Sequence, residues 1–157
     1  MRQIGSLLHL YLNESGRKFP KPNEYSYDGW IEELLEYSGS LDVSIFACPS
    51  DDKERTVDGD KRSYAVNQYL CRNDGLVQND ENPSMLVMLG ERSTAVSVIG
   101  TNGANNLYGV YNLSEHHDGG NRANVLFLDG HVESMETSFT SQRTPVWWNR
   151  RFKGEQD

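Results

Sequence analysis

The chain has 157 residues, a formal net charge of −8 and a hydrophobic share of 36%. This length suits one domain with a core of its own, so we expect residues 1–157 to form a single globular domain. An acidic chain lacks the basic face that supplies most of the affinity for nucleic acid, and we therefore exclude nucleic acid as a partner. No apolar run approaches the roughly 18 residues of a membrane span.

Two amphipathic helices are predicted in the first 40 residues. In residues 2–14 the apolar positions recur with the spacing of one helix face, and Gly16 is a suitable helix end. In residues 28–38 Asp28 is a suitable N-cap, and Gly39 follows. The predicted apolar faces consist of Ile4, Leu7, Leu8 and Tyr11 in the first helix, and of Trp30, Ile31, Leu34 and Leu35 in the second.

The middle of the chain is predicted to be rich in strands and loops. Residues 43–47 fit a short strand or an extended lead-in to Cys48, and the charged residues 50–62 are typical of a solvated surface loop. Strands are predicted at 63–70, 85–89 and 94–99. Residues 100–122 contain many Gly and Asn residues, and this composition predicts a long loop.

The strongest local signal is a hairpin near residue 130. Asp129-Gly130 separates strand formers at 124–128 from those at 131–135, and such a pair favours a type I′ turn. Because helices come first and strands follow, we predict an α+β fold: an N-terminal amphipathic helix packed on a small antiparallel β-sheet with long loops.

Histidines and aspartates around this hairpin raise the question of a metal site. His117, Asp118 and Asp129 carry groups that bind transition metals, and with His131 they could serve a metal-dependent hydrolase. Their spacing matches no closed zinc motif. The other interpretation is structural, with His117 bonded to loop backbone and Asp129 serving the turn. Oxygen-rich loops at 50–60 and 112–120 also suit calcium.

Cysteine and serine residues give little sign of nucleophilic catalysis. The sequence has no Gly-x-Ser-x-Gly elbow and no Cys-x-x-Cys pair, so we expect no enzyme activity. Cys48 and Cys71 are the only cysteines. They are disulfide candidates if the domain is exported, and two buried free thiols are the alternative.

Three segments, taken in order, resemble a known family. Residues 2–11 followed by 13–20, with their Gly16-to-Pro20 exit, look like the region after the hydrophobic segment of type IV pilin-like proteins. They are most similar to the major pseudopilins of type II secretion. Cys48-Pro49 and residues 63–70 resemble the branch with a prepilin processing-associated motif, which reads His, nine residues, Asp-Gly. Asp129, Gly130 and His131 fall in the hairpin that matches this motif.

The chain departs from that motif at one point. Eleven residues separate His117 from Asp129, and Gly119 stands where the histidine would fall. Two additional residues in the Gly- and Asn-rich loop account for the difference.

The resemblance implies a non-enzymatic subunit of a pilus-like filament, such as a type II secretion pseudopilus. Residues 1–15 would be the C-terminal part of the long pilin helix and 16–157 the head, with Ile4, Leu7, Leu8 and Tyr11 facing neighbouring subunits. A hydrophobic helix absent from this sequence would anchor the protein in the inner membrane, with a periplasmic head, before assembly. After a prepilin peptidase processes the precursor, that helix would pack in the core of the filament. The filament could also be extracellular. Major pseudopilins can bind calcium, but no loop of this chain matches that site residue by residue.

A different class of function fits the same composition. The chain could be a secreted or surface binding module that recognises carbohydrate or protein through the 100–122 loop.

Overall fold

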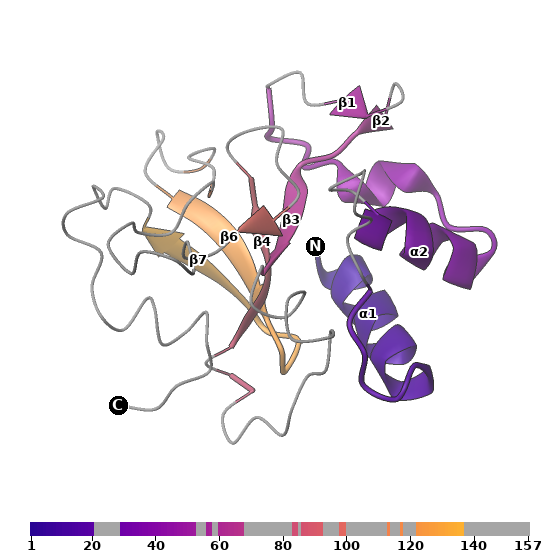
Figure 1. Cartoon of the computed structure of the whole chain (residues 1–157). Coiled ribbons are helices and arrows are strands. Elements are labelled where there is room, and N and C mark those ends of the chain that lie inside the picture. Colours follow the sequence, from indigo (N-terminus) through magenta and orange to yellow (C-terminus); the bar gives the residue numbers. More distant parts are fainter. Residues whose placement is uncertain are drawn as a thin grey trace, which may run out of the picture.

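The structure is a computed structural model, and it places helices against a mainly antiparallel sheet (Figure 1). The residues that it describes are 1–20, 29–52, 56–57, 60–67, 83–84, 86–92, 98–99, 113, 117 and 122–136. Within these ranges the α+β prediction is confirmed. No described helix combines the length and the apolar character needed to cross a membrane.

The first helix, α1 (Arg2–Glu14), spans the predicted residues. Gly16, in the left-handed region with φ 68°, follows it. The backbone N–H of Arg17 donates to the carbonyl of Leu12 at 2.7 Å, which is the six-to-one hydrogen bond of a Schellman motif. The glycine therefore stops the helix, as predicted, because it accepts a backbone conformation that costs most residues energy.

The apolar face of α1 packs inside this chain. Ile4 and Leu8 have no exposed surface, whereas Leu7 and Tyr11 are half-buried. The expectation that Ile4 and Leu8 face a neighbouring subunit is thus wrong, because the core of the same chain already covers them. The exposed large hydrophobic residue of the described part is Leu10, at 56%.

The second helix, α2 (Gly29–Ser38), also lies where it was predicted. The N–H of Gly39, with φ 69°, bonds the carbonyl of Leu35 at 3.1 Å and ends the helix. The predicted N-cap Asp28 lies outside the described residues. Of the four predicted apolar residues, Trp30, Ile31 and Leu34 are fully buried, and Leu35 is half-buried.

Side chains also join the two helices. The Tyr11 hydroxyl donates a hydrogen bond to Glu33 of α2, and burial together with this bond raises the pKa of Tyr11. The Tyr11 and Tyr37 rings meet edge to face with centroids 5.3 Å apart. Such aromatic pairs stabilise a fold by about 1 kcal/mol beyond the effect of the surface area that they bury.

Residues 43–47 form neither a strand nor an extended lead-in. Val43–Phe46 is a 3₁₀ helix, η1, because the Asp42 side chain accepts from the N–H of Ser44 at 2.9 Å and starts a turn. This local hydrogen bond outweighs the strand preference of the β-branched residues.

The charged 50–62 region is not wholly a solvated loop. It contains a two-stranded antiparallel ladder of β1 (Thr56–Val57) and β2 (Asp60–Lys61). Near the two ends of the 50–62 region, Asp51 and Arg62 are buried, with 3% and 4% of their surface exposed.

The main sheet has five strands in the order β5-β3-β4-β6-β7. All neighbours are antiparallel except β5 and β3, which run parallel. The strands are β3 (Tyr64–Asn67), β4 (Val87–Glu91), β5 (Val98–Ile99), β6 (Arg122–Phe127) and β7 (Val132–Glu136).

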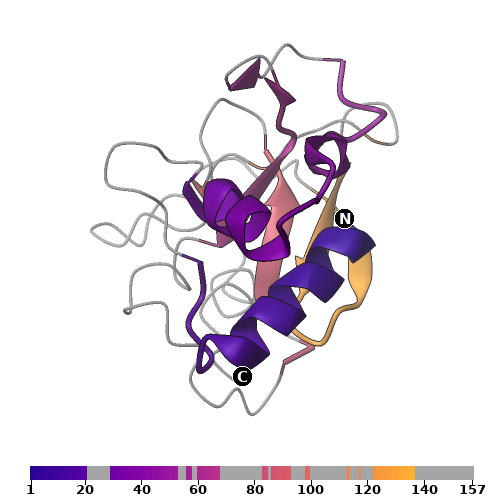
Figure 2. The same ribbon diagram turned by 90° about the vertical axis from the view of Figure 1, so that its right-hand side faces the viewer.

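Helices α1 and α2 lie on one face of this sheet (Figures 1 and 2). Alternate strand residues point to opposite faces, so Val66 and Leu126 join the helix-side core. Ala65, Val125 and Phe127 belong to a second cluster with Leu113 and Met135. Every described residue of β3 and β4 is consequently buried.

Gly5 allows the backbone of α1 to approach β6 closely. A β-carbon at this position would lie 2.9 Å from Cδ2 of Leu126, closer than real β-carbons come to a neighbour. Further along the helix, His9 lies beside Gly130 of the β6–β7 turn. The N-terminal helix and the late hairpin therefore form one packed unit.

The hairpin itself is confirmed, but its turn is not type I′. Of the two central residues, only Gly130 has a positive φ, 91°. Gly130 N–H bonds the carbonyl of Phe127, and Phe127 N–H bonds that of His131, both at 2.9 Å. This is a three-residue loop, a type I turn with a glycine bulge. Asp129 keeps a negative φ because one left-handed residue suffices to close this loop.

Candidate functional site

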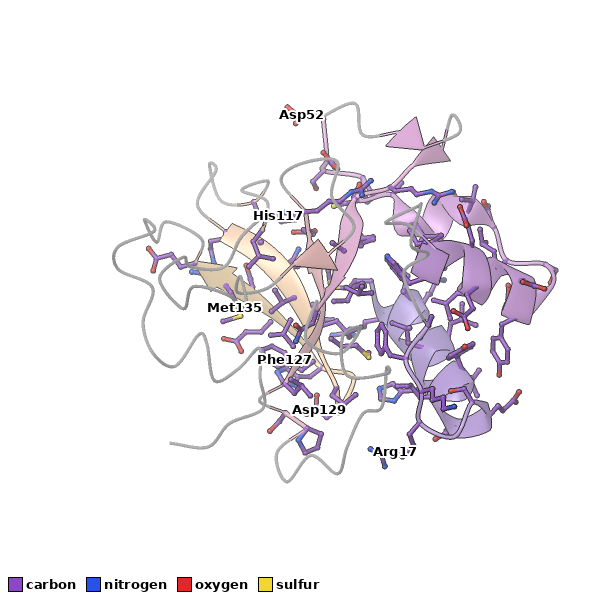
Figure 3. The ribbon with its side chains drawn as sticks, viewed as in Figure 1. Arg17, Asp52, His117, Phe127, Asp129 and Met135 are labelled. Carbon is purple, nitrogen blue, oxygen red and sulfur yellow. The ribbon has the colours of Figure 1, made fainter. Side chains whose placement is uncertain are left out.

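A cysteine, a glutamate and a histidine meet at the C-terminal end of β4, the central strand of the sheet. Cys48 follows η1, Glu91 ends β4, and His117 forms an isolated bridge with Arg122 at the start of β6. Figure 3 shows His117 beside that end of the sheet. The three potential ligand atoms all lie within 4.8 Å of one another, and among the described residues this is the one such group.

The Glu91 carboxylate is the centre of this group, and only 1% of the residue is exposed. Its Oε1 accepts from the Cys48 thiol at 3.3 Å and lies 2.9 Å from His117 Nε2. Its Oε2 accepts from the backbone N–H of Asn124 at 2.7 Å. A buried carboxylate is costly unless such donors surround it, so these contacts fix three separate segments to β4.

Backbone contacts hold the two partners of Glu91 in place. The Cys48 N–H donates to the Ser63 hydroxyl at 2.9 Å, and the Ser63 N–H donates to the carbonyl of Phe46 at 2.8 Å. The His117 N–H donates to the carbonyl of Arg122 at 3.2 Å. Each side chain therefore starts from a backbone that is tied to a neighbouring element.

The surroundings keep the thiol protonated at neutral pH. Burial is the main cause that raises the pKa of Cys48; a backbone hydrogen bond at Ser50 opposes this rise, and the charge of Glu91 adds to it. Burial, then the charges of Cys48 and Glu91, raises the pKa of Tyr64. Burial lowers the pKa of the Met1 amino group, against the attraction of the same two side chains.

This arrangement does not activate Cys48 as a nucleophile. A catalytic cysteine needs a lowered thiol pKa and a base within hydrogen-bond reach. Here the pKa is raised, and the His117 Nε2 is bonded to the same Glu91 oxygen that accepts from the thiol. The chemistry open to the group is hydrogen bonding or binding of a metal ion.

Buried arginines border this group. Arg92 has no exposed surface, and its Nε donates to the carbonyl of Arg62 at 2.6 Å. Its N–H donates to the carbonyl of Ser63 at 2.9 Å. The end of β4 therefore buries both a carboxylate and a guanidinium side chain, and the contacts of Arg92 tie it to the segment before β3.

The structure separates the residues predicted to form a metal site. His117 lies at the Arg122 end of β6, whereas Asp129 follows its Phe127 end (Figure 3). Six extended residues span about 17 Å, so His117 and Asp129 cannot share an ion, and the predicted set is wrong. The same separation excludes a hydrolase that combines His117 with His131. Asp118 lies outside the described residues.

Asp129 and His131 instead serve the turn, as the structural interpretation expected. Asp129 Oδ1 accepts from the N–H of His131 at 3.0 Å and lies 2.5 Å from its Nδ1. Burial raises the pKa of Asp129, but the hydrogen bonds from His131 outweigh it, and the net pKa is lowered. The His131 ring stacks on Phe127 with centroids 4.2 Å apart.

Cys48 carries a buried free thiol in this structure. Cys71 lies outside the described residues, so the disulfide between the two cysteines stays a prediction. Calcium stays a prediction, because the loops 50–60 and 112–120 that suit it lie partly outside the described residues. The group of Cys48, Glu91 and His117 does not offer the oxygen-only ligands that calcium prefers. Most of the 100–122 loop also lies outside the described residues, including the surface predicted for the binding module.

Sequence reasoning missed Glu91, Arg92 and the role of Cys48 beside them. The signal was present as two opposite charges one residue after the apolar run 86–89. Charges at the end of a buried strand need partners, but the sequence did not identify them. The chain matches no protein-family model, no curated protein and no solved structure.

Proposed function

We propose that this chain is the head of a pilin-like filament subunit and has no catalytic activity of its own. The observation that carries the proposal is the close contact between Gly5 of α1 and Leu126 of β6. It brings together the two segments with the most distinctive resemblance to pseudopilins, the N-terminal helix with its glycine exit and the hairpin that contains Asp129-Gly130. The raised pKa of Cys48 also supports a non-enzymatic role.

In such a filament the outer face of α1 meets the next subunit. Leu10 is exposed on this face, with the polar exposed residues Gln3, Ser6 and Asn13 around it. A heterologous contact that does not close into a ring generates a helical polymer, and a helix with one buried and one exposed face can supply it. The fully buried Ile4 and Leu8 then hold the helix on its own head.

A filament subunit of this kind also has a defined place in the cell. An apolar segment upstream of Met1 would anchor the subunit in the inner membrane, with the head in the periplasm, before assembly, and a prepilin peptidase would remove the basic leader of the precursor. The gene upstream of the codon for Met1 should therefore encode about 20 apolar residues, the length of a membrane span.

Assembly in cells that carry the whole gene tests the proposal. Leu10→Asp should block incorporation into filaments and leave the urea midpoint of the purified chain unchanged. Glu133→Lys is the matched control, because Glu133 is exposed on β7 and away from α1, and it should still assemble. Filaments of normal length with Leu10→Asp, or a gene without the apolar segment, would refute the proposal.

A further inference from the structure

We propose that Cys48, Glu91 and His117 form a zinc site. The site lies at the C-terminal end of β4, the central strand of the sheet. The proposal of a zinc site is independent of the proposed filament. A thiolate, an imidazole and a carboxylate together form a ligand set that suits zinc and its tetrahedral substitute cobalt. Magnesium and calcium prefer sets made of oxygen alone.

Two of the three distances between the donor atoms, those that involve Glu91, are close to the spacing around one ion. Ligand atoms of tetrahedral zinc lie about 3.3–3.8 Å apart, given bond lengths of about 2.0–2.3 Å. Here Cys48 Sγ is 3.3 Å and His117 Nε2 is 2.9 Å from Glu91 Oε1. These two hydrogen-bond distances would open by a few tenths of an ångström around an ion. The third pair, Cys48 Sγ and His117 Nε2, lies within 4.8 Å and would adjust to the same spacing.

A second layer of contacts orients the ligands. The backbone N–H of Asn124 holds Glu91 Oε2 at 2.7 Å, so that Oε1 is the oxygen that faces the other two ligands. The Ser63 hydroxyl holds the backbone N–H of Cys48 at 2.9 Å. Such outer contacts typically contribute tenfold or more to metal affinity.

Charge and access also fit a divalent cation. A Cys48 thiolate and the Glu91 carboxylate would be two buried negative charges in contact, and zinc neutralises both. The thiol loses its proton to solvent when the Zn–S bond forms, so binding weakens as the pH falls. The Tyr64 hydroxyl also interacts with the thiol. The His117 side chain is 24% exposed, so an ion and a water for the fourth position can enter there.

The test is zinc binding by the full chain after treatment with a chelator and a thiol reductant. Elemental analysis and calorimetry should find one zinc per chain. Cobalt should give the thiolate charge-transfer band and the ligand-field bands of a tetrahedral site. Cys48→Ser should remove the charge-transfer band, and His117→Ala should weaken zinc binding by more than about tenfold.

Two matched controls separate this site from others in the chain. His131→Ala removes the imidazole of the distant hairpin turn, and Cys71→Ser removes the second thiol; both should bind zinc as the wild type does. His117→Gln serves if His117→Ala does not fold, which circular dichroism of the metal-free proteins will show. Absence of stoichiometric zinc, or a greater loss of affinity in either control than in the site variants, would overturn the proposal.

Discussion

Gly5 of α1 and Leu126 of β6 approach each other so closely that no side chain fits between them. A β-carbon on Gly5 would lie 2.9 Å from one δ-carbon of Leu126 and 3.1 Å from the other. Leu126 is fully buried, so its δ-carbons would have to shift within a close-packed core. This contact determines how near the helix comes to the sheet.

Gly5→Ala should destabilise the chain although alanine is the better helix former. The gain in helix propensity is about 1 kcal/mol, and overpacking a filled core costs about 1–3 kcal/mol. We expect a net loss of about 1 kcal/mol in the free energy of unfolding, measured by urea denaturation. Ser6→Ala, at an exposed position of the same helix, should not lower stability.

A second substitution distinguishes the clash from other causes. Leu126→Val removes both δ-carbons, so the double variant with Gly5→Ala should be more stable than the sum of the single effects predicts. Additive effects would show that the two side chains do not compete for the same space.

Glu91→Gln should be among the most damaging single-atom changes in the described part of the chain. It replaces a carboxylate oxygen, which accepts hydrogen bonds from its neighbours, with an NH₂ group that can only donate them. In metal-free protein we expect a loss of about 2 kcal/mol, typical of a hydrogen bond to a charged group. Urea denaturation in the presence of a chelator measures it.

The exposed Glu36 on α2 offers the control. Glu36→Gln should change stability by less than about 0.5 kcal/mol. Equal effects of the two substitutions would mean that the contacts of Glu91 contribute nothing to stability.

Local features of the structure were predictable from sequence. The helices were found because apolar spacing and the terminal glycines Gly16 and Gly39 act within a few residues. The hairpin was found for the same reason. The turn type of the hairpin was not predictable, because a glycine in the left-handed region can close a two-residue loop or a three-residue loop.

The cluster at the end of β4 was not predictable, because it depends on register between distant strands. Gly90 pairs with Val125, which places Glu91 beside Asn124 and the bridge of His117. A shift of one residue would send Glu91 to the opposite face of the sheet. The sequence contains His117 and Cys48, but no local pattern links them to Glu91.

The Asp129–His131 turn should contribute stability that disappears in acid. Hydrogen bonds from His131 lower the pKa of Asp129 from 3.8 in spite of burial. A lowered folded-state pKa stabilises the fold above the unfolded-state value and ceases to do so as the pH falls through the folded-state value. The difference in stability between wild type and Asp129→Asn should therefore be constant above about pH 5 and shrink below about pH 4.

Urea midpoints from pH 2.5 to 7 measure this difference. Asparagine keeps a side-chain oxygen for the N–H of His131, so the comparison isolates the charge. Because the Asp129 side chain is 34% exposed, solvent weakens the effect, and it should be small. A difference in stability that grows on acidification would contradict the lowered pKa of Asp129.

The Cys48 thiol should react slowly with alkylating agents in the native chain. It is 6% exposed, and burial raises its pKa, so at pH 7 both access and thiolate are scarce. In a Cys71→Ser background, iodoacetamide labelling followed by mass spectrometry should proceed many times more slowly than in urea. The labelling rate should rise with pH, because the fraction of reactive thiolate grows as the pH approaches the raised pKa of Cys48. Saturating zinc should slow it further if the metal occupies the sulfur, whereas native labelling as fast as that of an exposed cysteine would contradict the buried position of the thiol.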